Sequence, residues 1–155
     1  MADHRKYRLA EHICHQVYAL DRALNRAYQT AFSDTGFTYP KYIVLLALDE
    51  HGPMTIGALS SHVGVETNTL SPLLKKMAEA GIVTRTRSLA DERQVLIETT
   101  EFGAEVLARA REAAAEIYDA FGLSEGDAAD LVTALSRLRD AVGEARPAQI
   151  SFPQR

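Results

Sequence analysis

Apolar side chains recur at helical spacing along most of the 155 residues. Between residues 8 and 33 they form one stripe, which predicts a long amphipathic helix. Residues 40–50 are apolar on almost every side and predict a short buried helix with a proline in its first turn. The next segment, 51–55, reads as a loop. Two more amphipathic helices are expected over residues 101–121 and 124–146, the last one opened by a serine–aspartate capping box.

The middle of the chain changes from helical spacing to alternation. Thr55 is a candidate N-cap for a short helix over residues 56–63, and a second helix is expected over residues 66–81. Two short helices joined by a few residues that include glycine form the helix-turn-helix pattern. Residues 82–87 and 94–99 alternate β-branched and polar side chains around a polar loop, which predicts a hairpin. The predicted fold class is therefore mainly α with a small β-hairpin wing: a winged helix-turn-helix flanked by long dimerisation helices.

Pro72 conflicts with this pattern because it lies well inside the second helix of the pair. Proline has no N–H to donate and crowds the carbonyl of Asn68, which costs about 3 kcal/mol in a helix interior. Two explanations are open: the helix begins later than residue 66, or it is kinked near its start.

The long flanking helices have apolar stripes that need a partner. A twofold homodimer is the commonest solution, and it would place two recognition helices in successive major grooves, roughly 34 Å apart. A monomeric helical bundle is the alternative. The expected organisation is a helical dimerisation region (1–33 and 101–146), a DNA-binding domain (34–100) and a loose C-terminal tail (147–155).

The net charge of −4 argues against a nucleic-acid partner until its distribution is considered. Residues 66–98 hold five basic and five acidic side chains, whereas residues 99–155 hold six and ten. The acidic excess therefore lies in the C-terminal third, and a local basic surface can still bind DNA. The N-terminus has no apolar signal region, no apolar run approaches the roughly 20 residues of a membrane span, and one cysteine suits a reducing compartment. We therefore expect a cytoplasmic protein with no membrane partner.

A winged helix places its second helix in the major groove of double-stranded DNA. Short hydrogen-bonding side chains near the start of that helix can reach base edges, while lysines and arginines suit phosphates. The alternative is an ordinary solvated face, but element order, spacing and charge together favour DNA binding. The predicted DNA-binding residues are Thr67, Asn68, Thr69, Ser71, Lys75, Lys76, Arg85, Arg87 and Arg93, with Asp91 as a partner that supports the wing.

Cys14 is the single cysteine, and it lies within the stretch His12-Ile13-Cys14-His15. On the first predicted helix it falls at the edge of the apolar stripe, a partly accessible position that suits a sensor thiol. It can also be a small buried hydrophobe or a metal ligand. His12 and His15 point away from Cys14 on a helix, so these three side chains do not converge on a metal. We expect neither a metal nor a cofactor.

The order of these elements resembles the MarR family of bacterial winged-helix repressors, over about residues 8–145. The most specific part is the stretch LSPLLKKMAEAGIVTRTRSLADERQVLIETTEFG. Its segment ADERQVLI, with Asp91 and Arg93, resembles the wing signature of that family. The segment TTEFG resembles an ending that recurs there.

Within that family the chain resembles the organic hydroperoxide resistance regulators of the one-cysteine type, including a proline at the position of Pro72. The resemblance implies that Cys14 is the peroxide-reactive residue, with Tyr28 and Tyr39 as its hydrogen-bond partners and Tyr18 nearby. Tyr28 lies 14 residues after Cys14, about 21 Å along a straight helix. Their contact therefore requires two such helices packed antiparallel across a dimer.

The resemblance implies a redox-sensing transcriptional repressor that is not an enzyme. Its reduced dimer would bind a pseudo-palindromic operator and release it when an organic hydroperoxide oxidises Cys14 to a sulfenic acid. Without a second cysteine, the sulfenic acid would form a mixed disulfide with a low-molecular-weight thiol or oxidise further. The alternative is a MarR-type repressor that senses a small phenolic or other ligand in the dimer cleft, with Cys14 structural. A thiol peroxidase is disfavoured, since one thiol has no evident acid/base partners.

Overall fold

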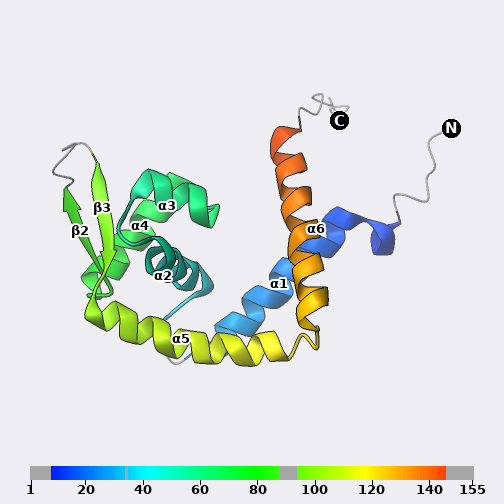
Figure 1. Ribbon diagram of the computed structural model, residues 1–155, viewed down its shortest axis with the longest axis horizontal. Coiled ribbons are helices and arrows are strands. Elements are labelled where there is room, and N and C mark those ends of the chain that lie inside the picture. The colour runs from blue at the N-terminus through cyan, green and yellow to red at the C-terminus, as the bar shows by residue number, and fades with distance from the viewer. Residues whose placement is uncertain (1–7, 34, 88–93, 146–155) are drawn as a thin grey trace, which may run out of the picture. The chain divides into compact units, whose positions relative to one another are not determined.

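The computed structural model describes residues 8–33, 35–87 and 94–145. Within these ranges the first and last elements are helical, and the strands lie between them in the sequence (Figure 1). The helical elements are a 3₁₀ turn η2 (Leu9–Glu11), α1 (Ile13–Ala31), α2 (Tyr39–His51), α3 (Ile56–Val63), α4 (Thr67–Glu79), α5 (Glu101–Asp119) and α6 (Glu125–Glu144). The strands are β1 (Met54–Thr55), β2 (Val83–Arg87) and β3 (Val95–Thr99).

The predicted helix-turn-helix is α3 and α4. Thr55 caps α3 as expected, since its hydroxyl accepts a hydrogen bond from the Ala58 N–H at 3.2 Å. Gly64 ends α3 in the left-handed region with φ of +67°. Gly81 follows α4 with φ of +72°, a conformation that glycine adopts without strain. The C-terminal ends of α3 and α4 therefore lie at the glycines from which the sequence predicts them.

The wing is part of a three-stranded antiparallel sheet with strand order β1-β3-β2. The predicted hairpin of β2 and β3 is confirmed, with Val83 opposite Thr99 and Arg87 opposite Val95. The prediction of a loop over residues 51–55 is wrong at its end, because Met54 and Thr55 pair with β3 as a third strand. Two residues are too few to show the alternation by which a strand is recognised.

The hydrophobic core lies where α2, α3, α4 and the sheet meet. Helix α2 is buried on several sides, as its apolar sequence predicts. Helix α4 contributes the buried side chains of Leu70, Leu74 and Met77. The central strand β3 contributes Ile97, which is fully buried. The largest fully buried side chains are Val44, Leu45, Leu59, Leu70, Leu74, Met77 and Ile97.

Helix α4 passes through Pro72 without a break. It begins at Thr67, so the explanation that the helix starts after the proline is wrong. The Glu66 carbonyl accepts from the N–H groups of Thr69 and Leu70, and the Ser71 hydroxyl donates to the Thr67 carbonyl at 2.8 Å. Burial of the apolar face of α4 offsets the cost of a proline inside the helix.

The first helix is shorter than predicted. Residues 9–11 form a 3₁₀ turn, and the extended backbone of His12 (φ −84°, ψ 107°) separates it from α1. None of the residues of α1 is buried, and its stripe residues Ile13, Val17 and Leu20 remain exposed in the single chain. The apolar stripe is present as predicted, but no other described residue covers these side chains.

The chain divides into two compact units, residues 1–117 and 118–155. In the first, α5 buries the predicted inward residues Leu107, Ala110 and Ala114. In the second, α6 begins with the predicted capping box, in which Ser124 Oγ accepts from the Asp127 N–H at 3.2 Å. Several apolar side chains of this second unit are exposed: Tyr118, Phe121, Leu123, Leu131, Val132, Leu135 and Val142.

Among the described residues, no helix is both long enough and apolar enough to cross a membrane.

Candidate functional site

The first turn of α4 presents the short polar side chains expected to read base edges. Thr67, Asn68 and Thr69 are exposed. Thr67 and Ser71 are already engaged, since the Thr67 hydroxyl donates to Ser60 Oγ at 3.3 Å and Ser71 bonds the helix backbone. Among the described residues, the Asn68 side chain accepts one weak hydrogen bond, from the Thr69 hydroxyl at 3.4 Å. Asn68 is therefore the side chain of this group with the most hydrogen-bonding capacity to offer a base edge.

The basic side chains of α4 lie further along the same helix. Lys75 and Lys76 are both exposed. Lys75 Nζ lies 3.9 Å from the Glu79 carboxylate one turn later, and both side chains are well solvated. A solvated pair of this kind is worth little and does not hold the lysine away from a phosphate.

The strand register sets the direction of the wing arginines. Arg85 lies opposite Ile97, and Arg87 lies opposite Val95. Residues directly opposite in an antiparallel pair point to the same face, and Ile97 faces the core. Both exposed arginines therefore leave β2 on the face that packs on the helices, and β2 contacts α4 (Figure 1). The structure places the two wing cations on a strand that contacts α4, while Asp91 and Arg93 lie outside the described residues.

Hydrogen bonds through Thr100 hold the start of α5 against the turn that follows α4. The Thr100 hydroxyl donates to the Gly81 carbonyl at 2.6 Å and accepts from the Gly103 N–H at 2.9 Å. A Cβ on Gly103 would lie 2.1 Å from the Ile82 carbonyl oxygen, so only glycine allows α5 to approach this closely. This contact gives a physical reason for the TTEFG segment and joins α5 to the turn between α4 and β2.

A second link joins α5 to α2. The Arg111 guanidinium donates to the Asp49 carboxylate at 2.6 Å. Both side chains are about half exposed, at 50% and 49%, which limits the stability that this ion pair adds. Its geometric effect is to tie the middle of α5 to the end of the buried helix.

Cys14 is the second residue of α1 and is exposed. It therefore lies in the first helical turn, whose backbone N–H groups have no acceptors within the helix. Tyr18, one turn later, is also exposed, and the Arg22 guanidinium lies 5.7 Å from its ring centroid. His15 is half-buried, and within the described ranges its Nδ1 has no hydrogen-bond partner.

The predicted tyrosines Tyr28 and Tyr39 lie together at the other end of α1. Their ring centroids are 4.4 Å apart. Tyr42 completes the group, 6.1 Å from Tyr28 and 6.3 Å from Tyr39. Sequence reasoning missed Tyr42, although its spacing of three residues after Tyr39 places both on one side of α2. We call Tyr28, Tyr39 and Tyr42 the tyrosine cluster; it does not include Cys14 or Tyr18.

Burial favours the protonated form of Tyr28 and Tyr39. Burial raises the pKa of Tyr28 above 10, and the neighbouring Tyr39 and Tyr42 raise it further. Burial also raises the pKa of Tyr39, with a further contribution from Tyr42. The hydroxyls of Tyr28 and Tyr39 are therefore protonated at neutral pH and can donate hydrogen bonds.

Alkaline titration of the tyrosines is expected to show a late component. Ordinary tyrosines ionise near pH 10, whereas Tyr28 and Tyr39 require a higher pH. The folded chain holds these protons longer than the unfolded chain does, so the free energy of unfolding falls as the pH rises above about 10. Ultraviolet absorbance measures tyrosine ionisation in the native protein and in a Tyr28→Phe/Tyr39→Phe variant. The late component should be absent from the variant. A single transition near pH 10 in both proteins would contradict the prediction.

The helix-turn-helix, the wing and their exposed cations define a winged-helix protein. The chain belongs to the MarR family of transcriptional regulators: the family's sequence pattern matches residues 37–95. It is 39% identical over 102 residues to the organic hydroperoxide resistance transcriptional regulator of Bacillus subtilis (strain 168), covering 66% of this chain and 68% of the relative.

Solved structures agree with this assignment. Reduced AbfR bound to DNA, a protein of Staphylococcus epidermidis, matches with a TM-score of 0.75 and 28% identity, over 90% of this chain and 98% of AbfR. PcaV from Streptomyces coelicolor, in complex with its natural ligand, matches with a TM-score of 0.81 and 25% identity, over 87% of this chain and 96% of PcaV. The predicted family and fold class are confirmed.

Proposed function

We propose that this chain is a dimeric, redox-sensing repressor whose signal is the oxidation of Cys14 by an organic hydroperoxide. The observation that carries the proposal is the placement of Cys14. It is an exposed thiol in the first turn of α1, and the tyrosine cluster lies at the far end of the same helix. The 39% identity to an organic hydroperoxide resistance regulator supports the same function.

The dimer follows from the uncovered apolar side chains. Ile13, Val17 and Leu20 on α1 are 62%, 41% and 44% exposed, and α6 exposes a similar stripe. Exposed stripes of this kind mark an interface between proteins. Two α1 helices packed antiparallel would bring Cys14 of one subunit to the tyrosine cluster of the other, and the dimerisation region would be residues 1–33 and 101–146.

The DNA interface is formed by α4 and the wing of the domain over residues 34–100. Asn68, with Thr67 and Thr69, faces base edges, and Ser71 supports the first turn. Lys75, Lys76, Arg85 and Arg87 contact phosphates, and Arg93 extends this set with support from Asp91. A dimer presents two such surfaces to a pseudo-palindromic operator.

The chemical step is a two-electron oxidation. The Cys14 thiolate attacks one oxygen of the hydroperoxide ROOH, the S–O bond forms as the O–O bond breaks, and RO⁻ leaves and takes a proton to become ROH. Cys14 becomes a sulfenic acid. Phenol donors from the partner's tyrosine cluster would bond this new oxygen. A low-molecular-weight thiol RSH would then convert it to a mixed disulfide and release water.

Fluorescence anisotropy on the DNA upstream of this protein's own gene tests the proposal. Reduced protein is expected to bind, and cumene hydroperoxide is expected to release it. A Cys14→Ser variant should bind equally well and should not respond, because a hydroxyl does not reduce the peroxide.

Two outcomes would contradict the proposal in different ways. If both proteins stay bound, Cys14 is not the sensor, and a small phenolic ligand in the dimer cleft becomes the better candidate. If neither protein binds this DNA or a randomised-sequence library at low salt, the DNA interface itself is wrong.

A further inference from the structure

Tyr42 is the member of the tyrosine cluster to which the function proposed above gives no role. Its side chain is 8% exposed, whereas that of Tyr39 is 37% exposed. Its ring centroid lies 6.1 Å from that of Tyr28 and 6.3 Å from that of Tyr39. Tyr42 is therefore the member of the cluster that belongs to the hydrophobic core, and it lies at nearly the same distance from both of the others.

Buried side chains hold Tyr42 in place. Phe32, which follows α1, is 4% exposed, and its ring centroid lies 6.1 Å from that of Tyr42. Phe37 in turn packs edge-on against Phe32, with the ring centroids 5.3 Å apart. One turn further along α2, Leu45 is fully buried. Aromatic pairs at these separations add to the stabilisation that burial gives, so the Tyr42 ring has a fixed position relative to α2 and the core.

Tyr28 lies on a helix that has no buried residue of its own, α1. It contacts α2 through two rings, since its centroid lies 4.4 Å from that of Tyr39 and 6.1 Å from that of Tyr42. The position of Tyr28 relative to α2 therefore depends on these two side chains. Of the two, Tyr42 is the one that is anchored in the core.

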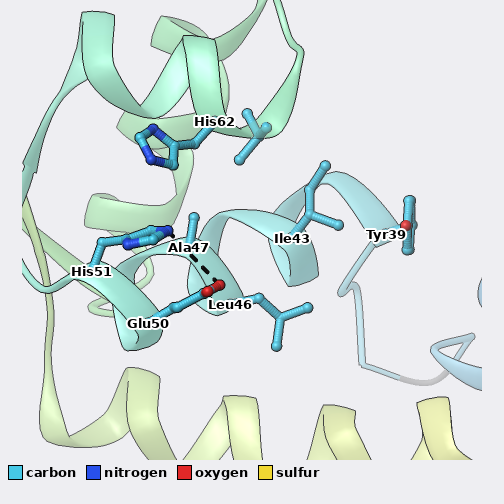
Figure 2. Close-up of a pocket in the computed structure, with 8 residues that line it drawn as sticks. Tyr39, Ile43, Leu46, Ala47, Glu50, His51 and His62 are labelled. Atoms are coloured by element: carbon cyan, nitrogen blue, oxygen red, sulfur yellow. Dashed lines mark ion pairs between the residues drawn. The ribbon is translucent and has the colours of Figure 1, made fainter. Parts of the chain in front are cut away.

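Tyr39 has room to move. It forms one end of a pocket of about 280 Å³ between α2 and α3, at the end of α2 that lies far from His51 (Figure 2). The rings of Tyr28 and Tyr42 are its aromatic neighbours. Because Tyr28 depends on α2 for its own position, the contact with Tyr42 limits where the Tyr39 hydroxyl can lie.

We propose that Tyr42 is a positioning residue of the peroxide sensor: its ring holds the hydroxyls of Tyr28 and Tyr39 where the oxidised thiol would meet them, and it passes their displacement to α2. The inference rests on the function proposed above and deepens it, because it names the residue that joins the thiol chemistry to the DNA-binding domain. Helix α2 packs against α3, and α3 packs against the recognition helix α4. A movement of Tyr42 therefore has a continuous packed path to the DNA interface.

Two variants at position 42 test the proposal, first by ultraviolet titration of tyrosine ionisation. Tyr42→Leu keeps a buried apolar side chain but removes the ring, whereas Tyr42→Phe keeps the ring. Burial raises the pKa of Tyr28 and of Tyr39. In Tyr42→Leu the late ionisation of this pair should therefore move toward pH 10, the ordinary value, and in Tyr42→Phe it should remain late. This measurement needs neither peroxide nor DNA.

The second measurement is the ratio of the dissociation constants for the DNA upstream of the gene after and before treatment with cumene hydroperoxide. Substitutions along a packed path change the coupling between two sites by about 2–30-fold. The ratio should therefore fall by such a factor in Tyr42→Leu and should match the parent in Tyr42→Phe. Mass spectrometry verifies that Cys14 is oxidised to the same extent in each protein, and reduced Tyr42→Leu should bind this DNA as the parent does.

Val44→Ala is the matched control, because Val44 is a fully buried residue of α2 outside the tyrosine cluster. It removes methyl groups from the core and leaves all three tyrosines in place, so both measurements should match the parent. Circular dichroism confirms that every variant is folded. The proposal is overturned if ionisation stays late in Tyr42→Leu, or if Val44→Ala lowers the ratio as much.

The function proposed above fails in a different way. A parent protein that stays on the DNA after Cys14 is oxidised would refute that function, and with it the passage of a displacement from Tyr42 to the DNA interface. The titration would still decide whether Tyr42 positions Tyr28 and Tyr39.

Discussion

Gly103→Ala is expected to lower the free energy of unfolding by about 3 kcal/mol, at the upper end of the range for overpacking. The added Cβ would lie 2.1 Å from the Ile82 carbonyl oxygen and 2.9 Å from the Thr99 side chain. The first of these is a backbone atom, so it cannot turn aside as a flexible side chain would. The clash would push α5 away from the turn after α4 and weaken the bond between the Thr100 hydroxyl and the Gly81 carbonyl.

Gly57→Ala is the matched control, because Gly57 also lies in the first turn of a helix of the same unit. An added Cβ there meets nothing within 4 Å, and the backbone is not in the left-handed region. Removing glycine from such a position stabilises a helix by about 0.5–1 kcal/mol. Urea unfolding followed by circular dichroism measures both variants. Equal changes in the two would show that the approach of α5 to Ile82 is not tight.

The turn and cap residues made most of the winged helix predictable from sequence. Thr55, Gly64 and Gly81 each act locally, so their neighbours in sequence are enough to place the helix ends. The β1 strand was not predictable in this way, because Met54 and Thr55 become a strand only through pairing with residues about forty positions later. Pairing between distant segments leaves no local pattern.

Pro72 is a second case in which a local rule does not predict the structure. A local rule counts only the cost of proline in a helix. The continuous helix is decided by Leu70, Leu74 and Met77, all fully buried against distant elements. Tertiary packing overrides the local preference here, and only the structure shows that it does.

The candidate site was predictable where its residues belong to one element. The α1 thiol and most of the predicted α4 side chains are exposed as helical spacing implies, while Ser71 is half-buried. The tyrosine cluster needs α1 and α2 to pack together, so the part played by Tyr42 could not be seen in the spacing of the first helix.

The second large effect is expected for Arg85→Ala, which should weaken DNA binding about equally for operator and random sequences. The register places Arg85 opposite Ile97, on the face of β2 that packs on the helices, and β2 contacts α4. There it suits a phosphate and not a base edge. Each phosphate contact contributes about 0.9 to the slope of log affinity against log salt, so a dimer that loses two contacts should lose about 1.8.

Arg109→Ala separates this contact from a general effect of charge. Arg109 is an exposed residue of α5, and its loss changes the net charge of the chain by the same amount. Counterions screen a distant charge beyond about 8–10 Å at physiological salt, so the slope for this variant should stay at the parent value. Anisotropy titrations over a series of salt concentrations give both slopes. If Arg85→Ala instead weakened binding only to the operator, the prediction would be contradicted, because the arginine would then contact base edges. Strand β2 would in that case enter a groove of the DNA together with α4.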